Sequence, residues 1–102
     1  MPQDKLRTGL VDNLLVAFTH AEDEDAVYAL LEDLCTPREI TDMSQRLEVA
    51  RLLSEKTSYI DIQERTGASA TTISRVSKCL NYGTGGYAAA LRAVGAEQGE
   101  GE

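Results

Sequence analysis

Four side chains in the second half of the chain share the chemistry of a surface that binds an anion. Thr71 and Ser74 carry short hydroxyl groups, and Arg75 and Lys78 carry positive charge. If residues 70–80 are helical, these four lie on one face, which holds no acid, and apolar residues lie on the other. Small hydroxyl side chains permit close approach, and Arg and Lys reach phosphates or base acceptors. This composition is typical of a helix that reads the DNA major groove.

The same face has an ordinary interpretation as well. Ser, Thr, Arg and Lys are common on the solvated side of a helix, and short helix pairs also occur in proteins that bind no nucleic acid. The net charge of the chain is −7, which does not by itself favour nucleic-acid binding. Residues 56–80 are nevertheless its only net-basic segment, at +2, and a local patch matters more for binding than the total charge.

Other chemistries find little support, and we expect neither an enzyme nor a metal site nor a cofactor. The sequence has no HExxH motif, no GxxxxGK[ST] loop and no evident nucleophile with its base. Its single histidine, His20, adjoins an acidic run that suits a solvated helix start. Cys35 and Cys79 lack a CxxC partner, so we expect both to be small buried residues.

The 102 residues predict one domain, over residues 1–94, with an aliphatic core that shares surface with a partner subunit. No apolar run is long enough to cross a membrane, and the N-terminus lacks a signal-peptide pattern. We therefore expect a cytoplasmic protein without a membrane partner.

Helical spacing of apolar residues predicts three helices before residue 56. The first, over about 4–19, is apolar on two faces, which favours burial between neighbours, one of them another subunit. The second covers about 23–34. The third ends at residue 54 or 55, and Thr36 and Glu39 form a capping-box pattern at its start.

Two shorter helices follow, and together they carry the four polar residues. Ser58 and Asp61 resemble a second capping box, and Gly67 ends that helix near Thr66. The next helix runs from residue 70 or 71 to 80. Three glycines then interrupt the chain before a possible last helix over 87–94, and residues 95–102 are expected to be a disordered acidic tail.

The helix pair carries a more specific pattern, GA-x-x-x-T-I-[ST]-R, at residues 67–75. Residues 34–80, with "TPREI" at the third helix, resemble the Trp repressor core, and the whole chain is similar to the Trp-repressor-related YerC/YecD family. The resemblance implies an all-α fold, an intertwined homodimer built from residues 4–55, and a helix-turn-helix over 58–80.

The resemblance also implies a function. It suggests a sequence-specific transcriptional regulator that binds double-stranded DNA at half-sites about one turn apart. The candidate DNA-contacting residues are Ala70, Thr71, Thr72, Ser74, Arg75 and Lys78.

An effector pocket follows from the same resemblance. Arg46 and Arg75 match the two arginines that hold tryptophan in Trp repressor, and Thr36 matches a pocket-lining threonine. Val76, however, stands where the repressor has a glycine that leaves room for the indole. Our hypothesis is that this protein does not use tryptophan, and a different small-molecule effector remains open.

A second departure concerns the first helix of the pair. Ile60 and Gln63 occupy positions at which the repressor carries basic residues, so fewer phosphate contacts are available and DNA affinity should be modest. This leaves an alternative, a non-enzymatic interaction module that retains the fold without tight DNA binding.

Overall fold

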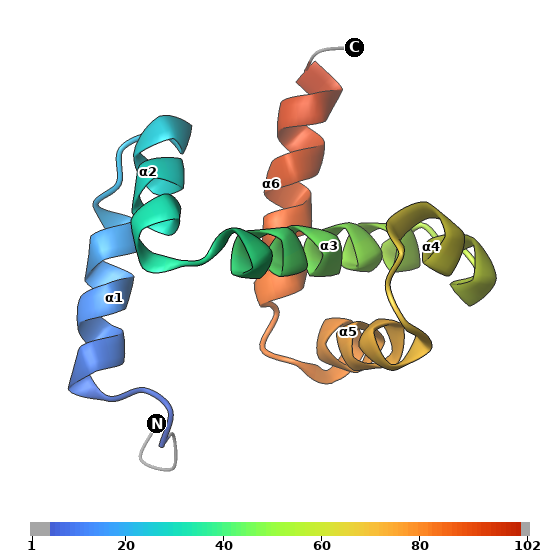
Figure 1. Ribbon diagram of the computed structural model, residues 1–102. Helices are drawn as coiled ribbons and strands as arrows, with labels where there is room; N and C mark the ends of the chain where they lie inside the picture. Colours follow the sequence, from blue (N-terminus) through green and yellow to red (C-terminus); the bar gives the residue numbers. More distant parts are fainter. Residues whose placement is uncertain (1–4, 101–102) are drawn as a thin grey trace. The chain divides into compact units, whose positions relative to one another are not determined.

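The computed structural model describes residues 5–100, apart from the side chains of 96–100, and every regular element in this range is a helix (Figure 1). The all-α fold class is therefore confirmed. The helices are α1 (Gly9–Thr19), α2 (Glu24–Leu34), α3 (Pro37–Ser54), α4 (Tyr59–Thr66), α5 (Ala70–Tyr82) and α6 (Gly86–Glu100). Where the sequence suggests one domain, the chain divides into two compact units, Met1–Ile40 and Thr41–Glu102.

The first unit holds α1 and α2, and none of its described side chains is buried. The expected start of the first helix at about residue 4 is wrong, because α1 begins at Gly9. The Thr8 hydroxyl accepts the Val11 backbone N–H at 3.3 Å and so caps the helix there. Leu10, at 82% exposure, projects from the first turn of α1 into solvent.

Thr36 and Glu39 form the capping box that the sequence predicts for α3. The Thr36 hydroxyl accepts the Glu39 N–H at 3.1 Å, and the Glu39 carboxylate accepts the Thr36 N–H at 2.8 Å. Both backbone groups would otherwise lack a helical partner. The start of α3 is thus fixed by residues close together in the sequence.

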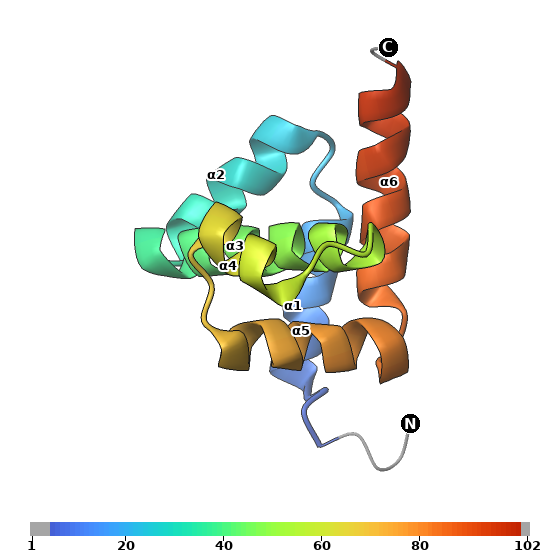
Figure 2. The same cartoon turned by 90° about the vertical axis from the view of Figure 1, so that its right-hand side faces the viewer.

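The core lies in the second unit, where α3, α4 and α5 meet. Its buried side chains are Val49, Ala50, Leu52, Ile62, Ala68, Ile73 and Val76. Tyr87 and Leu91 of α6 pack against this cluster from outside. Figures 1 and 2 show α6 upright, with α5 lying across its lower end. Both helices of the predicted helix-turn-helix therefore share one core with α3.

The C-terminal part of the fold differs from the sequence expectation. A helix was expected over 87–94 with disorder from 95, but α6 continues to Glu100. Ala, Glu and Gln are good helix formers, and no proline interrupts this stretch. Residues 101–102 of the expected tail lie outside the described residues. No helix in the described range is long and apolar enough to cross a membrane.

Candidate nucleic-acid interface

The first helix of the pair, α4, is held at both ends. Ser58 is its N-cap, and the Ser58 hydroxyl accepts the Asp61 N–H at 3.2 Å. Gly67 ends the helix with φ +76°, a left-handed conformation that favours glycine, and its N–H donates to the Gln63 carbonyl at 2.9 Å. The capping serine and the terminating glycine that the sequence predicts are confirmed.

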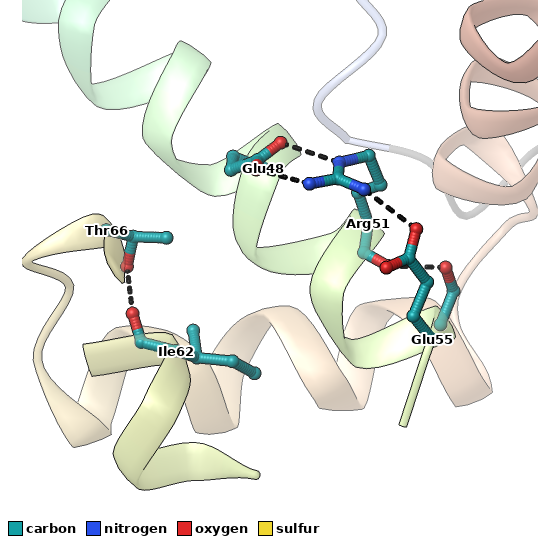
Figure 3. Close-up of polar contacts among 6 residues, drawn as sticks. Glu48, Arg51, Glu55, Ile62 and Thr66 are labelled. Atoms are coloured by element: carbon teal, nitrogen blue, oxygen red, sulfur yellow. Dashed lines mark hydrogen bonds and ion pairs between the residues drawn. The ribbon is translucent and has the colours of Figure 1, made fainter. Parts of the chain in front are cut away.

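The turn between α4 and α5 is fixed by side chains. The Thr66 hydroxyl donates to the Ile62 carbonyl at 2.7 Å (Figure 3) and accepts the Ala68 N–H at 3.1 Å. From α3, the Gln45 amide donates to the Thr66 carbonyl at 3.0 Å. The hydroxyl and the carbonyl of Thr66 and the N–H of Ala68 are therefore all hydrogen-bonded at the turn.

The second helix, α5, starts at a serine N-cap and buries one face. The Ser69 hydroxyl accepts the Thr72 N–H at 3.1 Å and lies 3.2 Å from the Thr72 hydroxyl. Ile73 and Val76 are buried in the core, and Leu80 is half-buried. The apolar face predicted for this helix is therefore the face that packs.

Five of the six candidate DNA-contacting residues are exposed on α5: Ala70, Thr71, Ser74, Arg75 and Lys78. The sixth, Thr72, is half-buried and hydrogen-bonded to the N-cap, which makes it a capping partner in the structure. The structure thus brings the hydroxyl and basic side chains together at the start and middle of one helix.

The positive charges on this face lack a counterion in the part of the chain that the structure describes. Among the described residues, neither Arg75 nor Lys78 has an ion pair or a side-chain hydrogen bond. A cationic face without a neutralising acid is suited to an anionic partner. Arg51 on α3, in contrast, forms ion pairs with two carboxylates.

Arg51 lies between two carboxylates of α3. It makes a bidentate pair with Glu48, at 2.9 and 2.7 Å, and a further contact with Glu55 at 2.7 Å (Figure 3). The hydrogen bond from Arg51 is the main cause that lowers the pKa of Glu48, and the charge of Arg65 on α4 lowers it further. The pKa of Arg51 is raised, chiefly by the same bond to Glu48. The ion pairs of this cluster all lie along α3 and the residue that directly follows it, Glu55.

A cavity of about 620 Å³ lies between α3, the end of α5 and α6. Its lining residues are Met43, Arg46, Leu47, Cys79, Gly83, Thr84, Gly86, Tyr87 and Ala90. It is largely apolar, and Arg46 is its one charged residue, without an ion pair among the described residues.

The predicted effector residues do not gather at this cavity as a set. Arg46 lines it, but Val76 is buried in the core and Arg75 is exposed on α5. Thr36, in the first unit, caps α3. The expectation that both cysteines are buried is wrong for Cys79, which is exposed and borders the cavity.

Sequence reasoning missed the residues that hold this site together. Gln45 and Thr66 form a contact between two helices, 21 positions apart, and local spacing gives no signal for such a pair. The Glu48–Arg51 pair, in contrast, has the i,i+3 spacing of a local helix pair. A signal did exist for Ser69, since serine directly before the first residue of a helix is a preferred N-cap. No three His, Cys, Asp or Glu side chains within the described residues could hold a metal ion.

Comparison with known proteins places this geometry in a family. The family model described as Trp repressor protein matches residues 10–95, a span that runs from α1 into α6. The chain belongs to the Trp repressor family.

Relatives within the Trp repressor family match over nearly the whole chain. The uncharacterized protein YerC of Bacillus subtilis (strain 168) is 47% identical over 94 residues, which cover 92% of this chain and 90% of YerC. A solved TrpR-like protein from Eubacterium eligens ATCC 27750 is 47% identical with a TM-score of 0.83, over 89% of this chain and 94% of that one. A solved protein from Staphylococcus aureus is 37% identical with the same TM-score, over 92% and 94%. The resemblance drawn from residues 34–80 is confirmed.

Proposed function

We propose that this protein is a sequence-specific DNA-binding transcriptional regulator of the cytoplasm, and that α5 is its recognition helix. The observation that carries the proposal is the exposed face of α5, where Arg75 and Lys78 have no counterion in the described chain. The caps at Ser69 and Gly67 hold this face on a fixed scaffold. Phosphates would neutralise the two cations, and Thr71 and Ser74 would contact base edges.

The proposal includes a homodimer. The first unit has no buried side chain among its described residues, and two of its large apolar side chains, Leu6 and Leu10, are 80% and 82% exposed. Such large apolar side chains on an unpacked unit indicate a surface that another chain covers. A symmetric dimer would present two copies of α5 to two half-sites of one operator.

We further propose that tryptophan is not the effector. The burial of Val76, which is 2% exposed and packs in the core beside Ile73, supports this proposal. Trp repressor is expected to have a glycine at this position, and a valine would leave less room for an indole. If an effector exists, the cavity lined by Arg46 and Cys79 is the place where it would bind. Its lining favours a mainly apolar molecule that carries a negative charge.

One observation favours a second function, an interaction module without tight DNA binding. Ile60 is 69% exposed on α4, at a position where a phosphate contact would call for a basic residue. An exposed branched apolar side chain is better suited to a protein partner than to a phosphate. This function and the first differ in whether purified protein selects DNA sequences.

The test is selection of bound fragments from a genomic DNA pool at moderate salt. We expect the unaltered protein to enrich particular sites, and Arg75→Ala and Lys78→Ala each to weaken binding to them by about tenfold. Arg92→Ala is the matched control, because it removes one exposed positive charge from α6 and should leave selection unchanged. If the unaltered protein enriches no sequence, the interaction module becomes the leading function.

A further inference from the structure

The contact from Gln45 to the turn is a tie between distant parts of the sequence. Its amide nitrogen donates to the Thr66 carbonyl at 3.0 Å, across 21 positions of the chain. The capping bonds of Ser58 and Ser69, in contrast, join residues only three positions apart. Gln45 therefore links α3 to the end of α4, whereas each cap acts within its own helix.

The acceptor of this bond is a group that needs a partner. Thr66 is the last residue of α4, and the carbonyls of a final helical turn have no intrahelical N–H to accept. Gln45 and Thr66 are both partly buried, which limits the access of water to the bond. Removing the donor of a partly buried carbonyl lowers the stability of the folded chain. The Gln45–Thr66 bond therefore favours the arrangement in which the two groups stay together.

The turn itself is rigid on the α4 side. Gly67 adopts its left-handed conformation there, and the Gln45 amide nitrogen lies 3.9 Å from the position that a Cβ on Gly67 would take. The Thr66 hydroxyl binds both the Ile62 carbonyl and the Ala68 N–H. Gln45 therefore binds the last residue of α4, from which the turn leads to α5.

We propose that Gln45 is a positioning residue that sets the direction of the recognition helix relative to α3. This inference rests on the proposed DNA-binding function for its consequence, which concerns half-site spacing. In a dimer, the direction of α5 in each subunit determines the distance between the two recognition helices. Gln45 thus contributes to the choice of operator spacing without touching DNA.

The structural half of the proposal is tested by solution NMR on the full chain. Gln45→Met keeps the length and helix propensity of the side chain but removes the donor, and Gln45→Lys keeps a donor of similar reach. Residual dipolar couplings report the direction of α5 in the frame of α3. We expect one common orientation in the unaltered protein, averaged or shifted couplings for α5 in Gln45→Met, and recovery in Gln45→Lys. Unchanged α5 couplings in a folded Gln45→Met variant would overturn the proposal.

The functional half uses operators whose half-sites are separated by spacers of different length. For Gln45→Met we expect affinity for the preferred spacing to fall by about tenfold, because one bond is lost in each subunit, and the preference among spacings to broaden. Binding to random DNA should not change. A merely structural role would lower affinity at all spacings equally and would contradict the proposal. If the unaltered protein selects no DNA, the proposed function fails, and the dipolar couplings still decide the role of Gln45.

Discussion

At the scale of single residues, Val76 is the basis of the proposal that tryptophan is not the effector. Its side chain is buried at 2% exposure among Ile73, Leu52 and Ile62. The cavity next to α5 is lined by Arg46 and by Cys79, which lies three residues after Val76. The β-branched side chain therefore stabilises the helix-turn-helix core directly.

Truncating Val76 should be costly. We expect Val76→Ala to lower the free energy of unfolding by about 2 kcal/mol, because buried methyl groups are lost and a cavity remains. Val76→Gly should cost about 1 kcal/mol more, owing to the lower helix propensity of glycine. Urea unfolding measures both, with the exposed Ser74→Ala as control.

Calorimetry should detect no tryptophan binding by the unaltered chain, and micromolar binding would contradict the role given to Val76.

The Glu48–Arg51 pair predicts a weak dependence of stability on pH. The pKa of Glu48 is lowered in the folded chain, so its contribution is present above the unfolded value of about 4.3 and is lost as pH falls through the lower folded value. Both Glu48 and Glu55 are substantially exposed, and we expect Arg51→Met to cost only about 0.5 kcal/mol at pH 7. Unfolding at pH 7 and pH 3 measures this difference. An equal cost of Arg51→Met at both pH values would rule out the charge contribution.

At the scale of elements, local signals determine where helices begin and end. The capping box at Thr36, the serine at Ser58 and the glycine at Gly67 could be read from the sequence, because each acts within four residues. The start of α1 does not follow from apolar spacing, which continues through Leu6, because the Thr8 N-cap makes the helix begin at Gly9. Apolar periodicity alone does not locate a helix end.

The candidate site was predictable only in part for a related reason. The polar and apolar faces of α5 follow from spacing within one helix, and the structure has them as expected. The bond from Gln45 to Thr66 joins residues 21 positions apart, and the cavity is lined by three helices. Both depend on tertiary packing, for which a single sequence contains no local pattern.

The junction between α5 and α6 offers a test at this scale. A Cβ on Gly83 would lie 2.3 Å from the Cys79 carbonyl oxygen, a backbone atom that cannot move without distorting the end of α5. We expect Gly83→Ala to lower the free energy of unfolding by about 1–3 kcal/mol. Gly86→Ala is the matched control, since nothing lies within 4 Å of its Cβ, and should change stability by less than about 1 kcal/mol. Equal unfolding midpoints in urea for the two variants would show that the clash is relieved easily.

At the scale of the whole molecule, charge is divided between the two units. Residues 1–40 contain three basic and nine acidic residues, a balance of −6, and residues 41–102 contain seven and eight, a balance of −1. The acidity that argues against DNA binding in the total charge therefore belongs almost entirely to the first unit. The second unit, which carries the exposed cations of α5, is close to neutral. Its net charge therefore does little to repel a nucleic acid from the basic face of α5.

In the proposed function the first unit forms the homodimer contact. A substitution in this contact should therefore lower the mass of the protein in solution from that of a dimer toward that of a monomer. Leu10 is 82% exposed, and Leu10→Glu would place a charge in an interface that covers it. We expect the unaltered protein to have twice the 11.1 kDa chain mass in light scattering, and Leu10→Glu to raise the dimer dissociation constant by at least about tenfold. Asn13→Glu adds the same charge at another exposed position of α1 and is the matched control. A Leu10→Glu protein that remains as dimeric as the control would place the subunit contact elsewhere and leave the apolar surface of the first unit for a different partner.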